Sequence, residues 1–135
     1  MSSFKSIKRF AAAITASLIF SLPVHASSFD KIPFDKPTFD QLQAKGETIL
    51  VDIYATWCPT CKKQQQVLND YFTAHPQSNI KVLVVDFDDQ KEWVKYFKAP
   101  RQSSLYLFKG KDQVWFSVAE TREQKIFSAL NSVSM

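Results

Sequence analysis

Residues 49–68 of this chain read ILVDIYATWCPTCKKQQQVL, and this stretch decides the fold. Residues 48–55 are β-branched and aromatic, a near-continuous apolar run typical of a strand buried on both faces. Residues 62–74 are rich in helix formers and carry apolar side chains at helical spacing. Pro59 suits the first turn of that helix, where its missing N–H costs nothing. Two cysteines, Cys58 and Cys61, therefore lie between a buried strand and the start of a helix.

Strand and helix patterns continue on both sides of this stretch. The sequence predicts a short strand near residues 31–34, a helix over 39–44 capped by Thr38, a strand over 80–87, a helix over 91–97, a hairpin of 104–108 with 114–118, and a last helix capped by Thr121 with Gln124 completing a capping box. The order is β-α-β-α-β-α-β-β-α. Alternation followed by a hairpin predicts an α/β fold, a mixed central sheet with helices on both faces.

Length and composition restrict the class of protein. The chain has 135 residues, room for one ordinary domain, and is 45% hydrophobic and 14% aromatic. These values exclude collagen and disordered or low-complexity chains. Two cysteines cannot form the disulfide lattice of a small secreted scaffold. We find no internal repeat and no linker.

The N-terminal residues have the pattern of a secretory signal peptide. Residues 1–9 are basic without an acid, residues 10–22 carry no charge, and the small residue Ala26 ends the segment. The uncharged stretch spans roughly 20 Å as a helix, too short for a bilayer core of about 30 Å. We therefore expect a signal peptide over residues 1–26 and one domain over residues 27–135; an uncleaved anchor is the alternative.

Cleavage after Ala26 changes the charge of the chain. It removes three positive charges, so the net charge falls from +4 to +4 − 3 = +1. Binding to nucleic acid then loses its electrostatic basis. We expect a periplasmic or secreted monomer, in a compartment that permits disulfides.

The position of the cysteine pair predicts a dithiol redox site. A helix N-terminus presents free N–H groups and about half a positive charge, which favours a thiolate on Cys58. Only the thiolate attacks disulfides. Cys61 lies one helical turn further on and inward, where it can resolve the mixed disulfide by forming Cys58–Cys61.

Three other interpretations of the pair remain open. A structural disulfide would close a very small loop and remove little entropy from the unfolded chain. A c-type haem site needs a histidine directly after the second cysteine, where this chain has Lys62. Zinc within one chain needs four ligands, and after cleavage the only histidine is His75, at the far end of the same helix. We expect no cofactor and no metal.

These residues resemble the active-site region of thioredoxins. The similarity lies in Trp57-Cys58-x-x-Cys61 after a Val-Asp-aromatic strand, and the element order of residues 27–135 fits the thioredoxin fold. Pro59 and Thr60 between the cysteines resemble the exported, periplasmic thioredoxin-like reductases that serve cytochrome c maturation.

The resemblance implies a role for each matching residue. Cys58 would be the exposed nucleophile, Cys61 the resolving thiol, and Trp57 an aromatic shoulder beside the site, or else a plug of the core. Asp52 matches the family's buried carboxylate, which exchanges a proton with the second cysteine. Independently, it is the one acid in an apolar strand, where burial should raise its pKa; the alternative is an aspartate that reaches solvent at the strand edge. The expected substrate-binding residues are Trp57, Pro59, Thr60, Gln102 and Ser103.

The chain also departs from the family pattern. Ser103 occupies the position of the family's cis-proline, and a serine peptide bond prefers trans by roughly 3 kcal/mol, so we expect a remodelled 102–103 loop. Pro100, through a shifted register, is the alternative. Val84 replaces a lysine beside the buried acid, so Asp52 should lack a cationic neighbour. Gln66 replaces the proline that bends the active-site helix, and Ala119 replaces a glycine of the substrate groove.

Together the sequence predicts an exported thiol–disulfide oxidoreductase, with reduction favoured over oxidation. Its partners would be client protein disulfides or dithiols and an upstream thiol–disulfide electron donor, membrane-bound or soluble. Two alternatives remain: a non-catalytic binding or chaperone module on the same fold, and a dimer that binds metal or an iron–sulfur cluster through the cysteine pair.

Overall fold

The elements follow the predicted order along the chain. The computed structural model describes residues 29–134. These form β1 (Lys31–Pro33), α1 (Lys36–Ala44), β2 (Thr48–Tyr54), α2 (Pro59–Ala74), β3 (Lys81–Asp86), α3 (Lys91–Tyr96), β4 (Ser104–Lys109), β5 (Asp112–Val118) and α4 (Glu123–Asn131).

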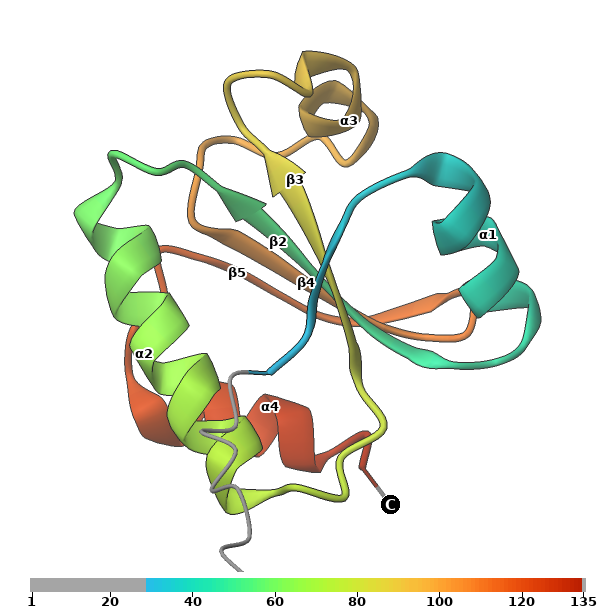
Figure 1. Cartoon of the computed structure of the whole chain (residues 1–135), viewed down its shortest axis with the longest axis vertical. Helices are drawn as coiled ribbons and strands as arrows, with labels where there is room; N and C mark the ends of the chain where they lie inside the picture. Colours follow the sequence, from blue (N-terminus) through green and yellow to red (C-terminus); the bar gives the residue numbers. More distant parts are fainter. Residues whose placement is uncertain (1–28, 135) are drawn as a thin grey trace, which may run out of the picture.

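One five-stranded sheet organises the domain, in the order β1-β3-β2-β4-β5 (Figure 1). β3 pairs in parallel with β1 and β2, whereas β4 pairs antiparallel with β2 and β5. The parallel pairs need helical crossovers, and the β4–β5 pair needs only a tight turn at Gly110, whose φ is +57°. The predicted mixed sheet is confirmed.

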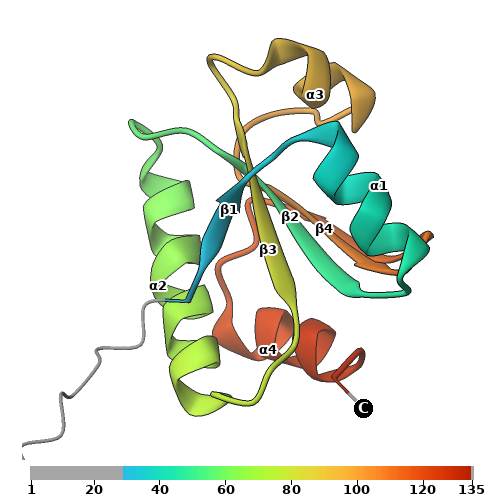
Figure 2. The ribbon, with the colours of Figure 1, turned by 45° about the vertical axis from the view of Figure 1, so that its right-hand side comes forward.

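Helices cover both faces of the sheet. α1 and α3 lie on one face and α2 and α4 on the other (Figure 2). The first layer packs aromatic residues against the sheet, among them Phe34, Phe39 and Phe97. The second layer includes Leu68 and Tyr71 of α2 and Leu130 of α4. The thioredoxin-type α/β architecture is therefore confirmed.

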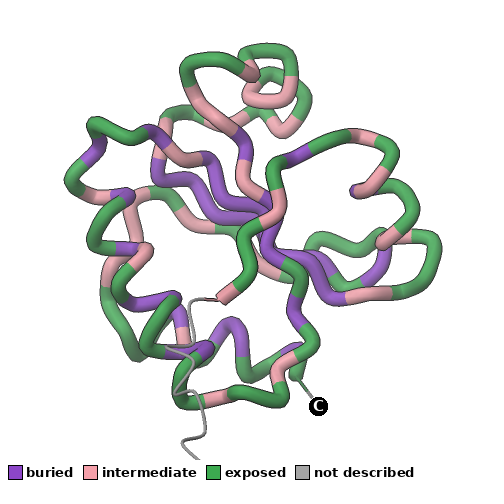
Figure 3. Tube along the Cα trace, in the orientation of Figure 1, coloured by how far each residue is buried: buried purple, intermediate pink, exposed green. Residues whose placement is uncertain are grey.

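The strand β2 lies at the centre of the domain. Six of its seven residues are buried, and buried backbone runs through β2, β3 and β4 (Figure 3). This burial on both faces explains the continuous apolar run in the sequence. β2 ends at Tyr54, and α2 begins at Pro59, so the cysteine pair lies at the carboxyl end of the central strand.

Two predicted helix caps are wrong. α1 begins at Lys36 and not at Phe39, because the side chain of Asp35, rather than of Thr38, caps it by accepting a hydrogen bond from the Thr38 N–H at 2.9 Å. Pro37 fits this earlier start, in the first turn. α4 begins after Arg122, and no side-chain hydrogen bond caps it, so the predicted box of Thr121 and Gln124 does not form.

The predicted signal peptide, residues 1–26, lies outside the described residues. Within residues 29–134, no helix is long and apolar enough to span a bilayer.

Candidate active site

Cys58 caps the N-terminus of α2. Its backbone is extended (φ −85°, ψ 113°), and its Sγ accepts a hydrogen bond from the Cys61 N–H at 3.1 Å. The Cys58 N–H in turn donates to the carbonyl oxygen of Ala55 at 3.2 Å, which fixes the turn between β2 and α2. Pro59 is exposed and occupies the first turn of α2, as predicted. The helix N-terminus therefore directs an amide at the Cys58 sulfur, where it stabilises negative charge.

Cys61 lies one turn below Cys58 and is fully buried. Burial, followed by the adjacent Cys58 sulfur, raises the pKa of the Cys61 thiol to about 12, and the charge of Asp52 acts in the same direction. Both cysteines are free thiols in this structure. In the dithiol form, the second member of the pair is therefore protonated at neutral pH.

The expected exposure of Cys58 is wrong, because only 1% of this residue is accessible to solvent. It packs with Ala55 and Cys61 in a small apolar cluster, against which Tyr54 and Phe87 also pack. The sequence predicted the backbone position of Cys58 but not the side chains that close over it.

Trp57 lies beside the pair as an exposed aromatic side chain, 56% accessible, and does not plug the core. Its Nε1–H donates to the carboxylate of Asp88 at 2.7 Å, which anchors the ring to the segment after β3. Thr60 is half-buried in the first turn of α2. The exposed Trp57 and Pro59 flank the covered sulfur.

Asp52 is a buried carboxyl in the middle of β2. None of the residue is exposed, and burial raises its pKa from 3.8 to about 7, as the lone acid in an apolar strand predicted. The Gln65 amide donates to Asp52 Oδ2 at 2.5 Å, which lowers the pKa and only partly opposes burial. The expected lack of a cationic neighbour is wrong: Val84 pairs with Asp52 across the sheet, but the charge of Lys31 on β1 still reaches the carboxyl.

Ser103 is buried directly before β4 in a left-handed conformation, with φ +62°. Its N–H donates to Ile53 O at 2.8 Å, and its carbonyl accepts the N–H of Ala119 at 2.9 Å. Residues 29–134 contain no cis peptide bond, so neither Ser103 nor the exposed Pro100 reproduces a cis-proline. The half-buried Gln102 precedes it, and its carbonyl accepts the Ser103 hydroxyl.

Ala119, at the family's glycine position, is also left-handed, with φ +55°. The hydrogen bond to Ser103 therefore joins two non-glycine residues in a conformation that L-residues rarely adopt. The surrounding contacts must hold both residues in place.

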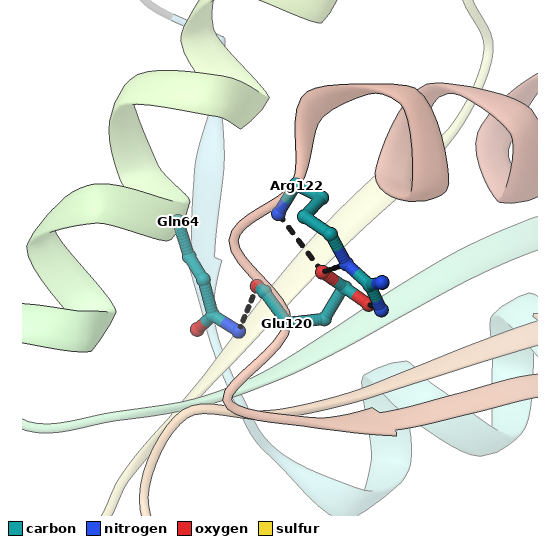
Figure 4. A network of polar contacts seen from close by, with 3 residues as sticks. All are labelled: Gln64, Glu120 and Arg122. Carbon is teal, nitrogen blue, oxygen red and sulfur yellow. Dashed lines mark hydrogen bonds and ion pairs between the residues drawn. The ribbon is translucent and has the colours of Figure 1, made fainter.

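Gln64 provides one such contact, which sequence reasoning missed. This fully buried side chain of α2 donates to the carbonyl oxygens of Ser103 at 3.1 Å and Glu120 at 2.9 Å. Figure 4 shows the second bond, together with the ion pair of Glu120 and Arg122 beyond it. A polar residue at the spacing of the buried helix stripe, three positions after Cys61, was the available signal. Gln66, in contrast, is exposed.

Residues 29–134 contain no group of three or more His, Cys, Asp or Glu side chains placed to hold a metal ion. The two thiols and the buried carboxyl of Asp52 form a site suited to thiol exchange.

Comparisons with known proteins agree with this geometry. The chain is 29% identical over 98 residues to the thiol:disulfide interchange protein DsbE of Haemophilus influenzae, covering 70% of this chain and 52% of that protein. It is 32% identical over 72 residues to DsbE of Vibrio cholerae, covering 50% and 37% of the two chains. The chain thus spans about half or less of the length of these curated relatives.

Solved structures match over more of their length. The crystal structure of Trxlp from Edwardsiella tarda is 33% identical, with a TM-score of 0.69, and the match covers 78% of this chain and 100% of that one. Malassezia sympodialis thioredoxin, at 19% identity and a TM-score of 0.68, shares the fold. The thioredoxin family model matches residues 30–132. With its cysteine pair at the carboxyl end of the central strand, the chain belongs to the thioredoxin family.

Proposed function

We propose that this protein is a thiol–disulfide oxidoreductase that reduces protein disulfides through Cys58 and Cys61. The observation that carries the proposal is the hydrogen bond from the Cys61 N–H to Cys58 Sγ at the N-terminus of α2, with the Cys61 thiol buried directly beneath. This amide stabilises a thiolate on the outer sulfur, while burial keeps the inner one protonated until it is needed. The relatives named thiol:disulfide interchange protein support this chemistry.

The reaction consists of two exchanges. Cys58 thiolate attacks one sulfur of a client disulfide, the client S–S bond breaks, and the first client thiol leaves. Cys61 then loses its proton and attacks Cys58 Sγ, which releases the second client thiol and leaves Cys58–Cys61 oxidised. The client gains two electrons, which an upstream dithiol donor must replace before the next cycle.

Asp52 would serve the second exchange. Cys61 must lose a proton despite its raised pKa, and the charges of the two groups influence each other. With a pKa of about 7, the carboxyl is about half ionised at neutral pH and can accept that proton.

The burial of Cys58 adds a requirement for the first exchange. Since 1% of the residue is exposed, the side chains packed around Cys58, among them Phe87, must shift enough to uncover Sγ before a client can react. The exposed Trp57, Pro59 and the Ser103 loop would then contact the client chain.

Export and the reducing direction are further parts of the proposal. The signal-like residues 1–26 support a periplasmic or secreted location, where client disulfides occur. The Pro59-Thr60 pair supports reduction through its resemblance to periplasmic reductases.

Trapping with Cys61→Ala tests the proposal. Without the resolving thiol, Cys58 is expected to hold client proteins as mixed disulfides that dithiothreitol releases, when the full chain is expressed in its native host. The trapped species would be identified by mass spectrometry after acid quenching. A reductase further requires that the wild-type pair be mostly reduced in the same cells.

The matched control is Cys58→Ala, which retains only the Cys61 thiol and should trap nothing. If Cys61→Ala captures no client, or if Cys58→Ala captures as many, the assigned division of roles is wrong. Clients retained by both variants without a covalent bond would instead identify a non-catalytic binding module.

A further inference from the structure

A chain of polar contacts runs from the surface of β1 to the buried Asp52. The ammonium of Lys31 donates to Gln65 Oε1 at 3.0 Å, and Gln65 Nε2 donates to Asp52 Oδ2 at 2.5 Å. The three residues come from β1, α2 and β2, so the contact exists only because the sheet places β1 beside the active-site helix.

The chemistry of the three groups fixes the direction of the chain. An ammonium has donors only, so it must face the oxygen of the Gln65 amide. The amide N–H₂ group then has to face Asp52, and because it too can only donate, it favours the ionised carboxylate. Lys31 thus orients Gln65 and adds its own positive charge to the same effect.

The position of Lys31 is itself restricted. Its Nζ lies 5.6 Å from the ring centroid of Phe29 and 6.0 Å from that of Tyr54. Lys31, Tyr54, Gln65 and Val84 line a surface hollow of about 410 Å³. The backbone of Lys31 is held in β1, where it pairs with Val82 of β3.

Few other charges face Asp52. Across the sheet, β3 and β4 place Val84 and Leu105 opposite it, and α4 adds apolar side chains to the same core. On α2, Cys61 is the ionisable group whose pKa responds to the charge of Asp52. Asp86, at the end of β3, lines the hollow, but its Oδ1 accepts the backbone N–H groups of residues 88 and 89. Lys31 is therefore the cation among the described residues that acts on the carboxyl.

We propose that Lys31 and Gln65 are positioning residues that favour the ionised form of Asp52 over the protonated form, so that the carboxylate can accept the proton of Cys61 in the second exchange. The inference rests on the proposed function, since it concerns the same proton. The transfer leaves Cys61 as thiolate and Asp52 as carboxylic acid, and the acid later returns its proton to solvent. The Gln65 amide exchanges no proton; it holds the carboxylate.

The test compares Gln65→Met and Lys31→Met with wild type in the reduced full-length protein. Two quantities are measured: the carboxyl titration midpoint of Asp52 by carbon-13 NMR, and the pH dependence of mixed-disulfide decay with a fluorescent peptide disulfide. Loss of the amide donor is expected to move both midpoints up by about one pH unit. Decay at pH 7 should slow about fivefold, because the ionised fraction falls from about one half to about one tenth.

Matched controls separate this effect from general perturbation. Gln66→Met and Lys81→Met alter exposed residues and should leave the Asp52 midpoint and the decay profile as in wild type. Lys31→Arg, which keeps the positive charge, should leave the Asp52 midpoint close to that of wild type. Lys31 is exposed, so Lys31→Met keeps the test decisive even if Gln65→Met folds poorly. An unchanged Asp52 midpoint in both variants overturns the proposal, and so does a shifted midpoint that leaves the decay profile unmoved. Failure of the proposed function is a different result, in which wild type forms no mixed disulfide at all.

Discussion

Asp52→Asn is expected to stabilise the reduced protein more at pH 8 than at pH 4. The difference in the free energy of unfolding between the variant and wild type should be about 4 kcal/mol larger at pH 8 than at pH 4. The pKa of this buried carboxyl is about 7 in the folded protein against 3.8 as its ordinary value. A raised folded-state pKa means that the folded protein binds the proton more tightly than the unfolded chain does. The contribution of Asp52 to wild-type stability is therefore greatest below pH 4 and is lost as the pH rises through about 7.

Chemical denaturation of both proteins across this pH range measures the difference. Because asparagine does not titrate, the steady cost of exchanging a carboxyl for an amide cancels between the two pH values. Asp70→Asn, on the exposed side of α2, is the matched control and should show no such trend. A wild-type advantage or deficit that stays constant from pH 4 to pH 8 would contradict the burial of an ionisable Asp52.

Gln64→Leu is expected to destabilise the domain by about 3 kcal/mol, or roughly 15 °C in Tm. Leucine fills similar space but cannot donate to the carbonyls of Ser103 and Glu120, which lie 3.1 and 2.9 Å from the amide nitrogen. Those loops contain the strained residues Ser103 and Ala119, so losing the contact also releases the conformation on which client binding depends.

Thermal unfolding measures the first effect, and hydrogen exchange of the Ala119 amide measures the second. Gln66→Leu, on the exposed face of the same helix, should change stability by less than about 0.5 kcal/mol. Equal effects at positions 64 and 66 would show that the Gln64 contacts contribute nothing particular.

Most of the fold could be predicted because its decisive signals are local. The apolar run of β2, the helical spacing in α2 and the hairpin of β4 and β5 each lie within one segment, and together they impose the element order. The helix ends were harder to predict. Asp35 and Thr38 are both good capping residues, and only the structure shows that Asp35 is used.

The candidate site divides in the same way. The raised pKa of Asp52 follows from one acid in an apolar strand, which a sequence displays directly. The contacts of Gln65 with Lys31 and of Gln64 with Ser103 join residues 34 and 39 positions apart. They depend on strand order and register, which no local pattern encodes.

The covering of Cys58 is a further case of long-range packing. Phe87, from the segment after β3, packs against the cluster that contains the sulfur, so its exposure depends on a part of the chain distant in sequence. The place of Cys58 at the N-terminus of α2, in contrast, follows from the neighbouring residues alone.

Alkylation of the reduced protein with iodoacetamide at pH 8, followed by peptide mass spectrometry, most directly tests which sulfur attacks. With a pKa of about 12, only about one Cys61 thiol in ten thousand is ionised at this pH. At Cys58, in contrast, the Cys61 N–H donates a hydrogen bond to Sγ and so favours the thiolate. Cys58 should therefore react at least about 100-fold faster than Cys61. Equal labelling of the two cysteines, or faster labelling of Cys61, would contradict the account.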